Sequence, residues 1–275
     1  MYKKYLVVAS KADLAGVNIT TQLSQFRGNP VLSSMQSKPS FDFYLVEDEI
    51  VYTRNLNLEK IREYDFVIFA SRHVSEKGGK SLCLHAPGNF RDSNLGGETG
   101  KVCPGSGLWQ KQCFERLNKN AGKFHLRDFK VTLECTHHGP LIDKPCVFVE
   151  IGSTEAEWKN SKAGFVVAKT IAETIEEFEE NPYNEIVVGI GGPHYCPNFN
   201  KIQLNSNLAI SHVIPQYVFP LTEEMVREVV EKTEEDVEFV LLDWKGLGSA
   251  EHRQQVLEVL DKLYLKYKKT SEIDK

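Results

Sequence analysis

The chain has 275 residues, of which 41% are hydrophobic and 26% charged, with a formal net charge of −5 at pH 7. This composition is typical of a soluble globular protein, and no apolar run approaches the roughly 20 residues of a membrane helix, which excludes a membrane-spanning protein. The negative charge argues against wholesale coating of nucleic acid, although 33 lysines and arginines can still form a local basic groove.

The N-terminal segment Met1–Ala9 has a basic flank, but its apolar part is too short for a signal peptide and leads into polar sequence. The six cysteines include no CxxC pair and do not resemble a disulfide framework in a chain of this length. We therefore expect a cytoplasmic protein with mostly buried free thiols.

Short apolar runs alternate with helical patterns along the chain, which predicts an α/β fold with a sheet covered on both faces. The predicted elements are, in chain order, strand Tyr5–Ala9, helix Leu14–Gln25, strands Phe43–Val46, Phe66–Ala70 and Ser81–Leu84, helix Gly107–Asn120, strands Val131–Glu134 and Val147–Ile151, helix Ser161–Glu180, strand Ile186–Ile190, helix Thr222–Lys232, strand Glu238–Leu242 and helix Ser249–Lys268. We expect residues 1–275 to form one domain, in which the Gly- and Asn-rich stretch Ser71–Gly107 is an active-site loop region.

Polar side chains follow six of the eight predicted strands. They are Arg72 and His73, His85, Glu134 with His137 and His138, Glu150, His194, and Asp243 with Lys245. In open α/β sheets, ligands bind just outside the carboxyl ends of the strands. The pattern predicts one shared pocket, although a lone strand-end histidine such as His73 is more often a loop residue with an ordinary hydrogen bond.

The segment from Glu134 to Ile142 is the most informative, because it places a carboxylate, a thiol and two adjacent imidazoles where a strand gives way to a Gly-Pro turn. Neighbouring positions on an extended segment point in opposite directions. We therefore expect one of His137 and His138 to face the pocket while the other is structural.

His85, His137, His138 and His194 are the candidate zinc ligands, because zinc takes neutral imidazole, thiolate and carboxylate ligands. No HExxH motif or paired CxxC supports this assignment by spacing. Without a metal, a histidine would be the general base and a carboxylate would orient it. The Gly191-Gly192 pair is either a phosphate cradle or a tight turn, and the chain lacks GxGxxG and P-loop patterns, so we expect no nucleotide cofactor.

Taken together, these motifs resemble the archaeal and plant type of D-aminoacyl-tRNA deacylase. The matching segments are Ser71–His73, Leu84–Asn89, Glu134–Pro140, Val149–Glu155 with Trp158, Gly191–Tyr195 and Asp243–Gly246. The glycine block departs from the expected Gly-Gly-Gly-His-Tyr at Pro193, and Cys196, Pro197 and Asn198 follow where a basic residue is expected.

The resemblance implies a three-layer α/β/α sandwich on a mixed, mostly parallel sheet of the phosphorylase/hydrolase type, with two zinc ions per subunit. It also implies hydrolysis of the ester that joins a D-amino acid to the terminal adenosine of tRNA, so the expected partner is the acceptor end of D-aminoacyl-tRNA. A metal-activated water would attack the ester.

Within this chemistry, Glu134 or Glu150 would take the proton, and Arg72 or an amide of a Gly-rich loop would stabilise the oxyanion. Substrate binding is assigned to Gly191, Gly192, Tyr195, Asn89 and Lys245. Tyr195 and Trp244 are candidates to stack on the terminal adenine, although core packing is the simpler explanation for Trp244. Lys101, Lys111, Lys201 and Lys245 are candidates for contacts with acceptor-stem phosphates.

Three alternatives remain open at this point. A zinc exopeptidase or amidohydrolase would act on small D-amino acid derivatives without RNA contact. A nucleoside phosphorylase would depend on phosphate. A non-catalytic, RNA-binding zinc protein would have saturated ligands and no turnover.

Overall fold

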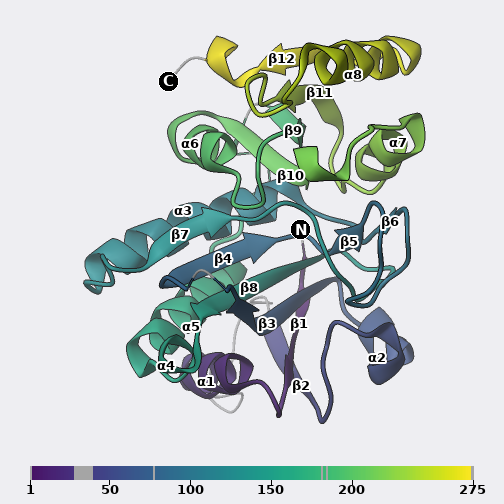
Figure 1. Ribbon diagram of the computed structural model, residues 1–275. Coiled ribbons are helices and arrows are strands. Elements are labelled where there is room, and N and C mark those ends of the chain that lie inside the picture. The colour runs from purple at the N-terminus through teal and green to yellow at the C-terminus, as the bar shows by residue number, and fades with distance from the viewer. Residues whose placement is uncertain (1, 28–39, 77, 181, 184, 274–275) are drawn as a thin grey trace.

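The strands of the computed structural model form two main sheets that lie one above the other (Figure 1). The structure describes residues 2–27, 40–76, 78–180, 182–183 and 185–273. The strand order is β2-β1-β3-β8-β4-β7 in the larger sheet and β10-β9-β11-β12 in the smaller, and a small ribbon pairs β5 with β6. Sequence reasoning had placed all strands in one sheet, whereas the chain divides them between two.

The six-stranded sheet is mixed and mostly parallel, as predicted. Its strands are β1 (Lys4–Ser10), β2 (Ser40–Val46), β3 (Phe66–Val74), β4 (Ser81–His85), β7 (Lys130–Leu133) and β8 (Cys146–Ser153). Strand β4 runs antiparallel to β8 and parallel to β7. The carboxyl ends of β4 and β7 therefore point in the opposite direction to those of β3 and β8. The prediction of one pocket at the carboxyl ends of the strands did not include this reversal.

The four-stranded sheet is fully parallel. It contains β9 (Glu185–Ile190), β10 (Leu208–Ile214), β11 (Val237–Leu242) and β12 (Tyr267–Lys269). The sequence predicted neither β10 nor β12. The helix predicted to reach Lys268 ends at Lys262, and Tyr264, with a left-handed φ of 55°, turns the chain into β12. The remaining ribbon pairs β5 (Gly88–Asn89) with β6 (Lys101–Val102), so part of the predicted loop region is ordered as strand.

The helices are α1 (Leu14–Leu23), α2 (Leu58–Arg62), α3 (Gly107–Lys123), α4 (Glu155–Trp158), α5 (Ser161–Glu176), α6 (Pro197–Asn205), α7 (Glu223–Glu231) and α8 (Ala250–Lys262). Side-chain caps begin α1, α2, α3, α5, α7 and α8, whereas α6 begins after Cys196 without one. Asp13, for example, caps α1 by accepting hydrogen bonds from the amides of Ala15 and Gly16. No helix in the described part of the chain is long and apolar enough to cross a membrane.

Alternating side chains of the larger sheet belong to two different cores, as the two-residue period of a strand requires. Tyr5, Val7 and Ala9 face the main core, whereas Leu6 and Val8 face a smaller core on the opposite side. The main core also contains side chains of the second sheet, and α3 lies between the two sheets and packs against α5 and β10. The single domain stays a prediction, which this shared core supports.

Lys111 is wholly buried, which makes it unavailable for the phosphate contact suggested from the sequence. Its Nζ donates to the carbonyls of Gln203 and Ser206, at 2.6 and 2.9 Å, and pairs with Glu115 at 3.0 Å. Burial lowers the pKa of Lys111, while its pairing with Glu115 raises it. The ammonium group therefore ties α3 to the C-terminal end of α6.

Replacing Lys111 with Met should lower the free energy of unfolding by about 2–3 kcal/mol, because charged hydrogen bonds to two carbonyls are lost. The change should leave the affinity for tRNA unaltered. Urea unfolding and a tRNA binding titration measure the two quantities. Lys262→Met is the matched control, since this side chain is 67% exposed and paired with Glu223, and it should change stability by less than about 1 kcal/mol. An unchanged stability of Lys111→Met would contradict the assignment.

Candidate metal and catalytic site

One face of the larger sheet changes from apolar to polar along its strands. Phe69 on β3 and Phe148 on β8 stack at 4.7 Å in the smaller core. Two and four residues further along the same face of β3 lie Ser71 and His73, and Glu150 follows Phe148 on β8. Because β4 runs the other way, its last residue, His85, pairs with Phe148 rather than with a strand end. The polar residues therefore meet across the middle of the sheet and not along one edge.

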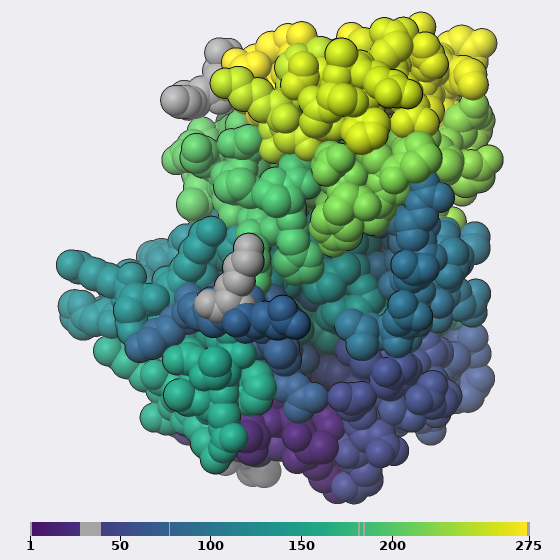
Figure 2. Space-filling model, in the orientation of Figure 1, coloured from purple at the N-terminus to yellow at the C-terminus, as the bar shows by residue number. Residues whose placement is uncertain are grey.

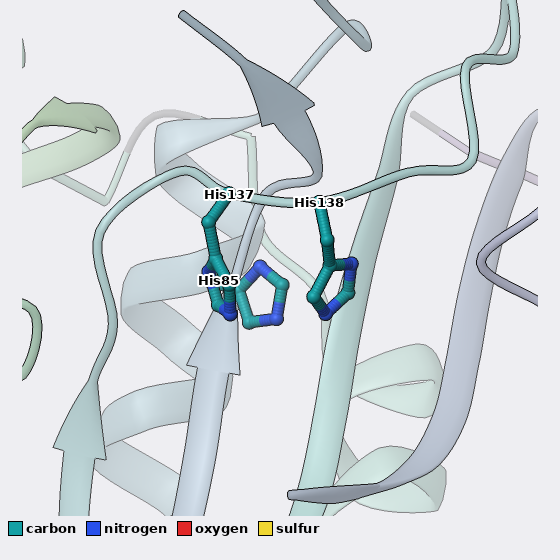
Figure 3. Close-up of side chains that lie close together, drawn as sticks. All are labelled: His85, His137 and His138. Carbon is teal, nitrogen blue, oxygen red and sulfur yellow. The ribbon is translucent and has the colours of Figure 1, made fainter. Parts of the chain in front are cut away.

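The loop after β7 covers these residues and places both of its histidines in the site. The ring of His85 lies 4.0 Å from that of His137 and 4.8 Å from that of His138, between ring centroids. Figure 3 shows His137 and His138 directed toward His85 from the same segment. The prediction that they face opposite ways is wrong, because His138 has a left-handed φ of 40° and the segment is not extended.

The three imidazoles share one hydrogen-bonding pattern. Nδ1 of His85, His137 and His138 donates to the backbone carbonyl of Ala86, Cys135 and Gly139, at 3.2, 2.8 and 2.7 Å respectively. This fixes the tautomer in which Nε2 keeps its lone pair, as is usual for histidines that bind a metal. Burial lowers the pKa of His85 and of His137 well below the ordinary value and that of His138 to about 4, so all three are neutral at pH 7.

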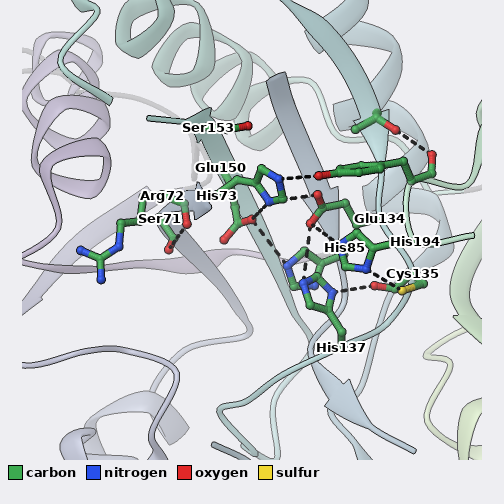
Figure 4. Close-up of polar contacts among 12 residues, drawn as sticks. Ser71, Arg72, His73, His85, Glu134, Cys135, His137, Glu150, Ser153 and His194 are labelled. Carbon is green, nitrogen blue, oxygen red and sulfur yellow. Dashed lines mark hydrogen bonds and ion pairs between the residues drawn. The ribbon is translucent and has the colours of Figure 1, made fainter. Parts of the chain in front are cut away.

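Two buried carboxylates stand among the imidazoles (Figure 4). Glu134 lies 3.0 Å from Nδ1 of His73, and its other oxygen lies 3.7 Å from Nε2 of both His137 and His194. Glu150 lies 3.8 Å from Nε2 of His85 and from Nδ1 of His73.

These surroundings shift the pKa values of the two carboxyl groups in opposite directions. Burial alone would raise the pKa of Glu134, but the close imidazoles of His194 and His73 outweigh it and lower the pKa below the usual range. Burial raises the pKa of Glu150 well above that range, and the charge of Glu134 raises it further.

His194 reaches the same site from the second sheet, after β9. Its backbone carbonyl accepts from the amide of Cys135 at 2.9 Å, so the loops that follow β7 and β9 are joined directly. Its Nδ1 lies 3.4 Å from Sγ of Cys135 and 3.3 Å from the hydroxyl of Tyr217. Burial would lower the pKa of His194, but its contacts with Cys135 and Glu134 raise the pKa to about 10.

Buried polar atoms in this cluster lack hydrogen-bond partners among the described residues. They are Nε2 of His85 and both carboxylate oxygens of Glu134. Four overlapping groups of three could each hold a metal ion, with ligand atoms within 4.8 Å of one another: His85, His137 and His138; Cys135, His137 and His194; His73, Cys83 and Glu134; and His85, Glu134 and Glu150. Leaving buried polar atoms unsatisfied is costly, so the residues fit a divalent cation.

A cavity of about 410 Å³ opens beside the cluster, and Glu150, His73, His137, His138 and His194 line it. Figure 2 shows the surface hollowed near the middle of this face, where the upper and lower parts of the molecule meet. Glu49, Ile50, Val51 and Leu95 form part of the remaining wall. The cavity therefore combines a polar floor with a partly apolar side.

The guanidinium of Arg72 points away from the histidine cluster in Figure 4. It pairs with Glu49 at 3.2 Å and lies 5.7 Å from the ring centre of Trp158. The cavity includes Arg72, but this geometry does not support its predicted role at an oxyanion.

The residues assigned to substrate binding are distributed unevenly. Tyr195 contacts the site, since its hydroxyl lies 3.0 Å from Nε2 of His73. The amides of Gly191 and Gly192 donate to Ile214 and Gly246, so neither is free to cradle a phosphate or an oxyanion, and their left-handed φ values favour the tight-turn explanation. Asn89 is buried and donates to the carbonyl of Gly96 at 2.8 Å.

Lys245 is exposed after β11 and does not line the cavity that adjoins the histidine cluster. Trp244 packs against the core of the second sheet, with Lys269 at 4.5 Å and Arg253 at 5.5 Å from its ring, which agrees with the core-packing explanation.

Three contributors to the site have no role assigned from the sequence. His73 is named there only as one of the strand-end residues, but β3 continues to Val74, and the alternation of Phe69, Ser71 and His73 places it beside Glu150. Cys83 follows the same logic, because it pairs with Glu150 in the sheet. No sequence pattern indicated Tyr217, because the strand that precedes it, β10, was not predicted.

The chain is similar in sequence to known proteins along most of its length. A family model described as D-aminoacyl-tRNA deacylase matches residues 60–268. The D-aminoacyl-tRNA deacylase of Thermococcus onnurineus is 32% identical over 281 residues, which covers 95% of this chain and 98% of the relative. That of Archaeoglobus fulgidus is 34% identical over 257 residues, which covers 89% of each chain.

A solved structure has the same fold. The crystal structure of a conserved protein of unknown function, AF0625, superimposes with a TM-score of 0.85 at 29% identity, covering 98% of this chain and 96% of that one. Because the family model spans well over half of the sequence, the chain belongs to the D-aminoacyl-tRNA deacylase family.

Proposed function

We propose that this chain hydrolyses the ester between a D-amino acid and the terminal adenosine of tRNA, in the cavity beside the histidine cluster. The observation that carries the proposal is one cluster of two buried carboxylates and five histidines, drawn from segments of both sheets, beside a cavity that Glu150 and four of these histidines line, in a member of this family. The partner is the acceptor end of D-aminoacyl-tRNA, and we place the enzyme in the cytoplasm.

We propose zinc as the cofactor, held by Nε2 of His85, His137 and His138. Their Nδ1 atoms are already engaged by backbone carbonyls, and neutral imidazoles are good zinc ligands. The group of Cys135, His137 and His194 offers a neighbouring place for a second ion. Bound zinc supplies Lewis acidity, which polarises a carbonyl and lowers the pKa of a coordinated water to about 7.

Glu150 is the better placed of the two carboxylates to take a proton from the attacking water, and a divalent cation held by the neighbouring imidazoles would lower its raised pKa and so favour the carboxylate form. It lines the cavity, whereas Glu134 lies behind the imidazoles and orients them through His73 and His194. Tyr195 in turn holds the other nitrogen of His73. Glu134 and Tyr195 thus position the histidines, and Glu150 faces the substrate.

The remaining assignments concern the RNA. Lys201 and Lys245 are exposed and are retained as candidates for phosphate contacts. Lys101 is also exposed but pairs with Glu228 at 3.2 Å, which partly neutralises it. Substrate roles for Arg72 and Asn89 require movement of contacts that both side chains already make.

Purified protein should deacylate tRNA charged with D-tyrosine and spare the L-form. Thorough chelation should abolish this activity, and added zinc should restore it, because the metal site is part of the catalytic centre. Release of tyrosine from both charged tRNAs, with and without chelator, measures this. Equal rates on the two forms, or equal rates on a small D-amino acid ester and on charged tRNA, would contradict the proposal.

Glu150→Gln should lower kcat by about 10²–10⁴-fold, as expected for loss of a general base, while the similar shape of Gln preserves the fold. Glu49→Gln is the matched control. It changes a carboxylate of the same cavity that is 56% exposed and paired with Arg72, and it should keep most of the activity. Steady-state kinetics measures kcat for both variants. If Glu49→Gln lowers kcat as much as Glu150→Gln does, Glu150 is not the general base.

A further inference from the structure

Tyr217 combines an anchored hydroxyl with an exposed ring. The hydroxyl lies 3.0 Å from Sγ of Cys135 and 3.3 Å from Nδ1 of His194, while 56% of the residue is exposed. The ring lies nearly parallel to that of His194, at a tilt of 28° and a centroid distance of 6.4 Å. An aromatic face thus stands at the surface directly beside the catalytic cluster.

The backbone around Tyr217 is also held in place. The short helix Gln216–Val218 follows β10, and the amide of Gln216 donates to the carbonyl of Gly192 at 3.0 Å. Arg91 donates from Nε to the carbonyl of Val218 at 2.9 Å and also bonds the carbonyl of Pro220. A ring fixed at its hydroxyl and at its backbone loses little conformational entropy when a flat ligand binds to it.

We propose that the exposed ring of Tyr217 stacks on the terminal adenine of the tRNA. This inference rests on the proposed function, which places the ester in the cavity lined by His194 and Glu150. The base is attached to the ribose that carries this ester, so it must lie within one nucleoside of the site. Tyr217 meets that requirement, and stacking on an aromatic ring suits a base because every base has a π-face.

Tyr195 and Trp244, suggested from the sequence, are less suitable platforms. Tyr195 is edge-on to His73 and His194, at 5.7 and 5.1 Å between ring centroids, and the ammonium of Lys130 lies 5.9 Å from its ring centre. Trp244 packs into the second sheet's core. The geometry therefore assigns Tyr195 to holding His73 and Tyr217 to holding the base.

A binding cycle with uncharged tRNA tests the ring of Tyr217 without requiring turnover. Affinity is measured for intact tRNA and for tRNA that lacks its terminal adenosine, with the wild type, Tyr217→Phe, Tyr217→Trp and Tyr217→Leu. Removing the adenosine should weaken binding by about 10-fold or more wherever an aromatic ring is present. With Tyr217→Leu, the two tRNAs should bind alike, which is the coupling that a double-mutant cycle isolates.

Tyr264→Leu is the control, since Tyr264 is 95% exposed and lies after α8; it should preserve the wild-type difference between the two tRNAs. If Tyr217→Leu still discriminates the two tRNAs as the wild type does, the proposal is overturned. A wild type that binds intact tRNA better but does not hydrolyse D-tyrosyl-tRNA would instead contradict the proposed function and leave the stacking intact.

Discussion

The buried carboxylate of Glu134 is the constraint on which the site depends. An ionised carboxylate away from water is costly unless positive charge or hydrogen bonds surround it. Imidazole nitrogens of His73, His137 and His194 lie 3.0 to 3.7 Å from its two oxygens. These come from a strand, from the loop after β7 and from the second sheet. Stabilising one charge therefore requires both sheets to be in place, and a divalent cation among the imidazoles would complete the balance.

The topology explains how such distant segments meet. The reversal of β4 and β7 within a mostly parallel sheet brings His85 and the loop after β7 back over β8, where Glu150 projects from the sheet. Backbone hydrogen bonds from Cys135 to His194 and from Thr136 to Val213 then fasten this loop to the second sheet. The left-handed backbone at His138 turns both neighbouring imidazoles inward. The loop after β7 therefore both connects the two sheets and carries two histidines of the site.

Local patterns predicted much of this. Apolar runs located eight strands, and the polar residues after them identified His85, Glu134, Glu150 and His194. The direction of β4 could not be predicted, because strand pairing is a long-range property that a short apolar run does not encode. The backbone of His138 was missed because a left-handed residue other than glycine leaves little trace in sequence.

Two further side chains have roles that the sequence did not indicate, because these roles depend on tertiary packing. Lys111 looked like any surface lysine, and only the packing of α3 against α6 shows that its ammonium group binds two carbonyls. The position of Tyr217 beside the site was not predicted, because β10, the strand that precedes it, was not predicted either. In both cases tertiary contacts, and not residue type, decide what the side chain does.

We propose that imidazoles from β4 and from the loop after β7 hold one metal ion beside the two carboxylates. Anomalous diffraction at the zinc edge, from crystals grown with zinc, locates such an ion. We predict an anomalous peak within coordination distance of His85, His137 and His138. If a fully zinc-loaded crystal shows no peak at these three residues, they do not hold the metal ion.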